Sequence, residues 1–106
     1  MKIVLCNCPP DAAPTIARAV VEAGVAACVN LIPGVRSIYS WEGEICDDVE
    51  TTLLIKTSEA QVGALRVALL EAHPYDVPEV VVVDVNDEAS HGPYVGWVVE
   101  MCTPRA

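Results

Sequence analysis

Two long strand-like segments joined by a short turn limit what this chain can fold into. The segment VAACVNLIPGVRSIYSW (25–41) runs into the turn-like WEGE (41–44), and the returning segment DVETTLLIKT covers residues 48–57. β-Branched and aromatic residues favour strands, and a glycine at the tip suits a tight hairpin. Pro33-Gly34 interrupts the first segment, which favours a bulge or bend over a regular strand. Any fold of this chain must therefore accommodate a long antiparallel hairpin.

Two helices are predicted on either side of this hairpin. Asp11 can cap a helix over residues 12–23, which has an apolar face and a glycine directly after it. Ser58 and Gln61 have the spacing of a capping box, so a second helix should begin there. It must end before Pro74, because helical geometry is disfavoured for the residue that precedes a proline.

Two further strands and a C-terminal helix complete the pattern. Residues 2–8 (KIVLCNC) read as a first strand, and residues 78–85 (PEVVVVDV) read as a last one. The continuous apolar run 80–83 predicts burial on both faces of the sheet. Gly92-Pro93 precedes a short helix in which apolar residues recur at helical spacing.

The order of these elements predicts an α+β fold. A βαββαβ order is the ferredoxin-like pattern, in which two helices cover one face of a four-stranded antiparallel sheet. We expect one domain over residues 1–106, with an extra C-terminal helix and an extended central hairpin.

The central hairpin is too long for such a small sheet and predicts an oligomer. Its projecting part would carry apolar side chains that the helices cannot cover, among them Val35, Ile38, Tyr39 and Trp41. An exposed strand edge of this kind promotes aggregation unless another chain pairs with it. We therefore expect assembly through these strands.

Charge and cysteine content restrict partners and compartment. The net charge is −9, so nucleic acid and anionic membranes are not expected partners. No apolar run approaches the roughly 18 residues of a membrane span, and the N-terminus lacks the features of a secretory signal. Five cysteines, an odd number, indicate reduced thiols and a cytoplasmic protein.

Cys6 and Cys8 are candidate ligands for a soft metal ion. Side chains alternate along a strand, so the two thiols of Cys6-Asn7-Cys8 share one face. Paired thiolates suit copper or zinc. The alternative is ordinary packing, because cysteine is also a common small core residue.

His73 is the second candidate ligand. It stands between the predicted second helix and last strand, bracketed by Pro74 and Pro78, with Asp76 and Glu79 nearby in sequence. Imidazole binds copper and zinc well. The alternative is a histidine that ends the helix and interacts with its free carbonyl groups.

The sequence contains few other signs of binding or catalytic chemistry. Lys56, in an apolar strand, is expected to pair with a carboxylate such as Glu79 or Glu42, or to contact an anionic ligand. No phosphate-binding glycine loop and no hydrolase motif is found, so neither an enzyme nor an organic cofactor is expected.

Four separate motifs in the correct order resemble the CutA family, the divalent-cation tolerance proteins. They are AACVNLIPGVRSIYSWEGE, LLIKT, HPYDVPE and YVGW, and together they span nearly the whole chain. The resemblance implies a ferredoxin-like homotrimer in which long strands bridge subunits. It also implies a link to copper and other divalent metals.

The resemblance extends to individual residues. Cys6 matches a cysteine and His73 matches the second histidine of the copper ligands described for a bacterial family member. Ala72 replaces the first histidine, and Cys8 is an additional thiol that could compensate if it lies close in space.

The family resemblance also implies a second kind of site. Lys56, Tyr75, Glu79, Tyr94 and Trp97 match recurring family positions that could line clefts between subunits, as in signalling trimers of the PII type. We therefore expect a trimer that binds divalent or soft metal ions for cation tolerance. The alternative is a PII-like signalling or scaffolding trimer that binds a small molecule or a partner protein in these clefts.

Overall fold

The computed structural model describes residues 1–103 and has the expected order of elements. The sheet is antiparallel with strand order β2-β3-β1-β4, which confirms the α+β, ferredoxin-like prediction. The elements are β1 (Lys2–Cys8), α1 (Ala13–Glu22), β2 (Cys28–Trp41), β3 (Glu44–Thr57), a 3-10 turn (Glu59–Gln61), α2 (Val62–Ala72), β4 (Val81–Asp84) and α3 (Gly92–Met101).

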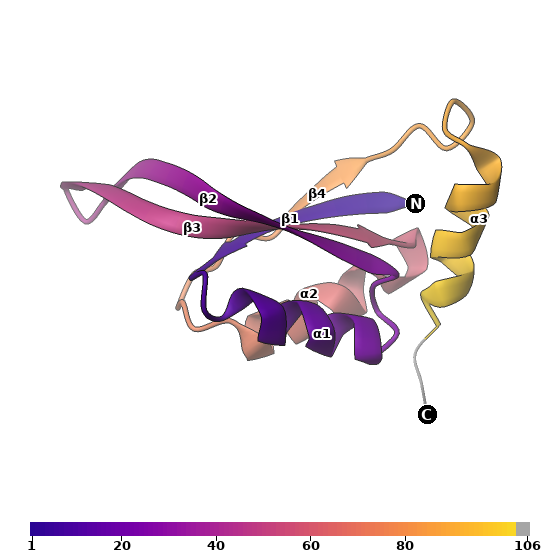
Figure 1. The fold of residues 1–106 in the computed structure, drawn as a ribbon, viewed down its shortest axis with the longest axis horizontal. Coiled ribbons are helices and arrows are strands. Elements are labelled where there is room, and N and C mark those ends of the chain that lie inside the picture. Colours follow the sequence, from indigo (N-terminus) through magenta and orange to yellow (C-terminus); the bar gives the residue numbers. More distant parts are fainter. Residues whose placement is uncertain (104–106) are drawn as a thin grey trace.

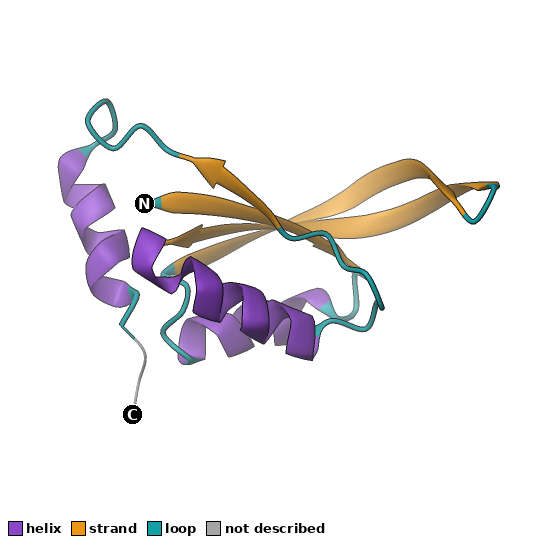
Figure 2. Ribbon diagram, turned by 180° about the vertical axis from the view of Figure 1, so that it is seen from behind, coloured by secondary structure: helices purple, strands orange, loops and turns teal. Residues whose placement is uncertain are grey.

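Helices α1 and α2 lie together against one face of the sheet (Figure 1). The core forms between them and the inward-facing residues of β1 and β3, such as Val4, Cys6, Leu53 and Ile55, each at most 1% exposed. Figure 2 shows the same layer from behind, with α3 standing apart at the end of the strands. The alternation of strand side chains thus accounts for which residues enter the core.

The two predicted helix caps are wrong in detail. Asp11 forms no cap, because α1 begins one residue later than expected with Ala12 at the N-cap and no side-chain cap. Ser58 precedes a 3-10 turn, where its carbonyl oxygen accepts from the Gln61 N–H at 3.1 Å. Gly24, as expected, ends α1 with a positive φ of 74° that suits glycine.

The β2–β3 hairpin extends far beyond the helices (Figure 1). Its turn is Glu42-Gly43, and β3 begins at Glu44, earlier than the predicted 48–57. The register shifts by one residue between Ile32 and Val35, which confirms a bulge at Pro33-Gly34. This shift decides which side chains of the outer hairpin share a face.

Strand β4 is shorter than predicted and lies at an edge of the sheet. The side chains of Val81, Val82 and Val83 are 40–47% exposed, so burial on both faces is wrong for the single chain. The edge position explains the difference, since β4 has a neighbouring strand on one side only. Within residues 1–103, no helix has the length and apolarity to cross a membrane.

Candidate functional site

The segment after α2 is shaped by its prolines. Helix α2 ends at Ala72, and His73 has an extended backbone with ψ of 136°. Pro74 requires this, because its ring clashes with a helical residue before it. The His73 N–H still donates to the carbonyl oxygen of Leu69 at 2.9 Å. The imidazole therefore leaves the helix end in a fixed direction, toward β1.

Both ring nitrogens of His73 are hydrogen-bonded. Nε2 lies 2.8 Å from the carbonyl oxygen of Asn7, and Nδ1 accepts from the backbone N–H of Tyr75 at 3.1 Å. A carbonyl can only accept, so the ring proton sits on Nε2. The side chain is 7% exposed and its ring contacts that of Tyr75 at a centroid distance of 4.7 Å. A metal ion would have to displace one of these two hydrogen bonds.

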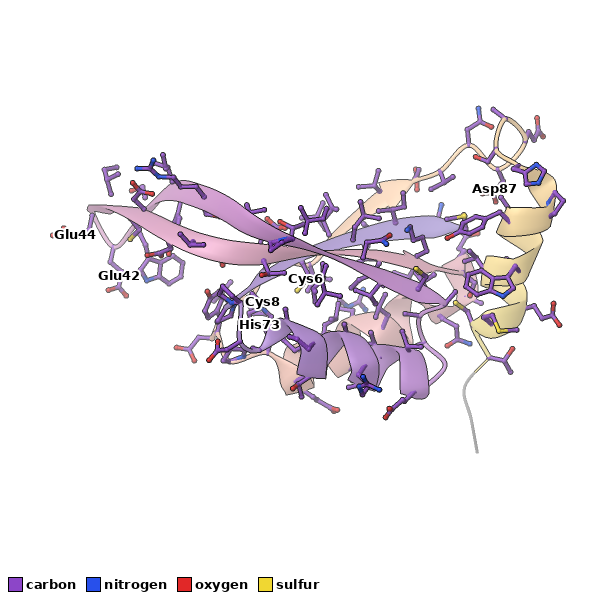
Figure 3. All side chains as sticks on the ribbon, in the orientation of Figure 1. Cys6, Cys8, Glu42, Glu44, His73 and Asp87 are labelled. Atoms are coloured by element: carbon purple, nitrogen blue, oxygen red, sulfur yellow. The ribbon has the colours of Figure 1, made fainter. Side chains whose placement is uncertain are left out.

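Cys6 and Cys8 point into the core beside His73 (Figure 3). Burial, followed by the neighbouring thiol of Cys8 and two glutamates, raises the pKa of Cys6 to about 12. Burial also raises the pKa of Cys8, whose Sγ donates to the Thr51 carbonyl oxygen at 3.7 Å. Both thiols are therefore protonated at neutral pH, whereas a metal binds the thiolate.

The three expected metal ligands therefore lie at one end of β1, but as hydrogen-bonded or protonated groups. Asn7, whose carbonyl oxygen receives the His73 proton, lies between the two cysteines in sequence. Across residues 1–103, no group of three or more His, Cys, Asp or Glu side chains is arranged to hold a metal ion. Metal binding at this end of β1 would require rearrangement and the release of protons.

A cleft of about 750 Å³ lies between the outer hairpin and the segment 74–79. The bulge sets its hairpin wall, because the shifted register places Ser37, Tyr39 and Trp41 on the same face as Glu50. The complete lining is Asn7, Ser37, Ile38, Tyr39, Trp41, Glu50, Pro74, Tyr75, Asp76, Val77 and Glu79. We call this feature the hairpin cleft.

Glu50 is the buried charge of the hairpin cleft. It is 7% exposed, and its Oε2 accepts from the Tyr75 hydroxyl at 3.0 Å. Burial and this hydrogen bond raise the pKa of Tyr75 to about 12. Burial, together with the negative charge of Glu50, raises the pKa of Glu79. With Asp76, three carboxylates thus line one cavity.

The five residues expected to line a cleft fall into two groups. Tyr75 and Glu79 line the hairpin cleft. Tyr94 and Trp97 stand on α3, at the opposite end of the molecule from the hairpin tip (Figure 1), with their rings 5.7 Å apart. Lys56 lies on β3 outside the cleft lining and donates to Asn30 Oδ1, so the expected pairing with Glu79 or Glu42 is wrong.

Sequence reasoning missed Asn7, Glu50 and Trp41 as cleft residues. Glu50 lies in the polar stretch DDVETT, which reads as an exposed strand. Its burial depends on the loop that carries Tyr75, which is remote in sequence. The bulge at Pro33-Gly34 was the one available signal, because it changes which residues of β2 face the cleft.

A family model described as CutA1 divalent ion tolerance protein matches residues 2–101. A Thermus thermophilus relative, named divalent-cation tolerance protein CutA, is 40% identical over 93% of this chain and 95% of its own. The mouse protein CutA is 48% identical over 87% of this chain. The chain spans about half the length of that mouse relative, with 51% of it covered.

The fold agrees with solved structures of the same family. The PII-like protein CutA of a Nostoc species, in apo form, superimposes with a TM-score of 0.94 at 44% identity, covering 99% of this chain and 100% of its own. The Thermus thermophilus structure gives 0.91 at 39% identity, covering 97% and 100%. Sheet, helices and cleft thus define an α+β protein of PII-like build. The chain belongs to the CutA1 divalent ion tolerance family.

Proposed function

We propose that this chain contributes to divalent-cation tolerance as a cytoplasmic homotrimer that binds divalent or soft metal ions, copper among them. Family membership over residues 2–101 supports the tolerance role. All five cysteines are free thiols, which is typical of a reducing compartment. The role proposed is binding, not catalysis.

The observation that carries this proposal is the position of His73 against the end of β1 that carries Cys6 and Cys8. The His73 ring bonds to the carbonyl of Asn7, the residue between the two cysteines. Thiolate and imidazole together suit copper and zinc. Binding would replace the His73 contacts and release the thiol protons, so affinity should rise with pH.

Trimer formation is supported by apolar surface that the single chain leaves open. Ile38, Ile45 and Val49 on the hairpin are 63–75% exposed. Strand β4 adds three exposed valines at the sheet edge. Covering such surfaces with other copies of the chain removes both the apolar exposure and the free edge.

Native mass spectrometry with and without Cu²⁺ tests both parts of the proposal. A wild-type trimer that takes up about one copper per equivalent subunit supports it. The Cys6→Ala/His73→Ala variant should lose this uptake. The matched control, Cys46→Ala/His91→Ala, removes one thiol and one imidazole elsewhere and should retain it. Equal uptake by both variants would place the copper outside these ligands.

A second candidate is a PII-like trimer that binds a small molecule or a partner protein. The hairpin cleft favours it, since about 750 Å³ lies within the range of small-molecule sites. In a trimer, Lys56, Tyr94 and Trp97 of one subunit could approach Tyr75 and Glu79 of the next. A thermal-shift screen of small molecules tests this role, because a ligand of the native state alone raises the melting temperature.

A further inference from the structure

The hairpin cleft is negatively charged and has no positive side chain in its wall. Glu50, Asp76 and Glu79 are its charged residues, and no lysine or arginine of the described part of the chain lines it. The ion pairs among residues 1–103 involve Asp47, Asp84 and Asp87, so none of them neutralises these three carboxylates. Residues 1–103 therefore supply no counter-charge to the cleft.

Glu50 carries the argument because it is both buried and open to the cleft. A carboxylate that is 93% removed from solvent loses much of its hydration, and desolvated charge is costly unless it is paired. One oxygen, Oε2, accepts from Tyr75. Among the described residues, Oε1 has no hydrogen-bond donor, yet no side-chain oxygen is both fully buried and unpaired. Oε1 is therefore accessible, and the cleft is the space in front of it.

Glu79 is a second carboxylate in the cleft that favours the binding of a cation. It lines the same cleft, and the negative charge of Glu50 helps to raise its pKa. A cation held between the two carboxylates would remove their repulsion. It would also favour the ionised form of Glu79.

The rest of the wall distinguishes an organic cation from a metal ion. Tyr39, Trp41 and Tyr75 supply aromatic rings, and Val77 supplies aliphatic surface. A small divalent ion prefers a close shell of oxygen, nitrogen or sulfur atoms. Aromatic faces beside carboxylates suit an ammonium group instead, through cation–π attraction and charge-assisted hydrogen bonds.

We propose that the hairpin cleft binds a small organic ammonium ion with an apolar body, its charge facing Glu50 and Glu79 and its body facing Trp41. This inference rests on the second candidate function, the small-molecule cleft, and names its ligand class. It is independent of the proposed copper ligands, because Cys6, Cys8 and His73 do not line the cleft.

Isothermal titration calorimetry near neutral pH tests the proposal with three probes of nearly equal size. They are 2-phenylethylammonium, the neutral 2-phenylethanol and the anionic phenylacetate. We expect the ammonium ion to bind at least about tenfold more tightly than the alcohol, as one charge-assisted hydrogen bond predicts, and phenylacetate not to bind. Equal affinity for amine and alcohol would overturn the charge assignment but leave a small-molecule cleft. If none of the three probes binds, this inference is overturned. The copper proposal would not be affected, because native mass spectrometry with Cu²⁺ tests it separately.

Variants locate the site. Glu50→Gln should weaken 2-phenylethylammonium binding at least about tenfold. Glu44→Gln, on the exposed hairpin tip outside the cleft (Figure 3), should leave it unchanged. Glu79→Gln tests the charge on a side chain that is only partly buried, should Glu50→Gln fail to fold.

Native mass spectrometry of Glu50→Gln tests whether Glu50 instead stabilises the oligomer. If the oligomer dissociates and the wild type ignores the amine, Glu50 pairs with a basic residue of another copy and the proposal fails.

Discussion

At the scale of single residues, His73 connects two segments of the fold through its imidazole ring. Its ring joins β1 to the segment after α2 by hydrogen bonds at both nitrogens. The sequence placed this histidine correctly at the end of a helix before a proline. It could not indicate the Asn7 carbonyl as a partner, because that contact joins residues 66 positions apart.

Replacing His73 should therefore destabilise the fold whatever its part in metal binding. His73→Ala leaves the Tyr75 N–H and the Asn7 carbonyl without partners, and we expect a loss of about 2 to 3 kcal/mol in unfolding free energy. Urea unfolding at one fixed protein concentration measures it. The exposed His91→Ala is the control, and equal effects of both substitutions would contradict the role given to His73.

The five thiols should differ sharply in reactivity. Cys6, Cys8 and Cys102 are buried, and the pKa of Cys6 is raised to about 12. A thiol must ionise to react, so iodoacetamide should label these three only after unfolding. Peptide mass spectrometry reads the result, with the urea-unfolded protein as the reference for complete labelling. Faster labelling of Cys6 than of the half-buried Cys46 would show that the core opens there.

Glu79 should make stability depend on pH. Its pKa in the folded chain lies above the ordinary glutamate value because of burial and Glu50. Between these two pKa values the folded chain binds more protons than the unfolded chain, so stability falls as pH rises through that interval. The stability of Glu79→Gln relative to wild type should therefore increase from about pH 4 to about pH 7. Urea unfolding of both proteins across this range checks it, and a stability difference that stays constant with pH would contradict it.

At the scale of elements, local sequence patterns predicted strands, helices and the bulge well, but not the details that depend on neighbours. The Pro33-Gly34 bulge and the Glu42-Gly43 turn follow from residues adjacent in sequence. The exposure of β4 does not, because four consecutive valines look alike at the centre and at the edge of a sheet. Edge position is set by chain topology.

Two glycines allow a matched test of backbone conformation. At Gly43 and at Gly63 an added Cβ would meet open space. New packing contacts should therefore contribute little to the stability change of either alanine variant. Gly43 has a φ of +80° in the hairpin turn, and Gly43→Ala should cost about 1 to 2 kcal/mol. Gly63 lies in α2, where Gly63→Ala should stabilise by about 0.5 to 1 kcal/mol. Opposite signs in urea unfolding confirm this, whereas a shared sign contradicts it.

At the scale of the whole molecule, a long hairpin beside a small core leaves apolar surface exposed. The sequence predicted this surface from strand length alone, and Ile38, Tyr39 and Trp41 are indeed exposed. The hairpin cleft could not be predicted in the same way. It forms only where the outer hairpin meets the segment 74–79.

A single charge on the hairpin should disrupt the proposed trimer. Ile45 is 75% exposed near the hairpin tip. A lysine at this position would bury an unpaired charge between copies, and the free energy of that burial would exceed the free energy gained from the contact. We expect Ile45→Lys to shift the protein toward monomer at micromolar concentration, as measured by analytical ultracentrifugation. Val67→Lys, on the outer side of α2 at 52% exposure, should leave the assembly intact. An unchanged Ile45→Lys assembly would exclude the hairpin tip from the interface.

The bulge at Pro33-Gly34 also affects how the protein can evolve. Between the bulge and the turn, the register decides that Ser37, Tyr39 and Trp41, and not Ile38 and Ser40, share the face of Glu50. Loss of one codon at the bulge would straighten β2 and leave these pairs in place, because the Glu42-Gly43 turn fixes the register of the outer hairpin. The inner half of the hairpin, paired with β3 before the bulge, would keep its register. A lineage can thus gain or lose one residue at the bulge while the cleft wall and the core both keep their side chains on the same faces.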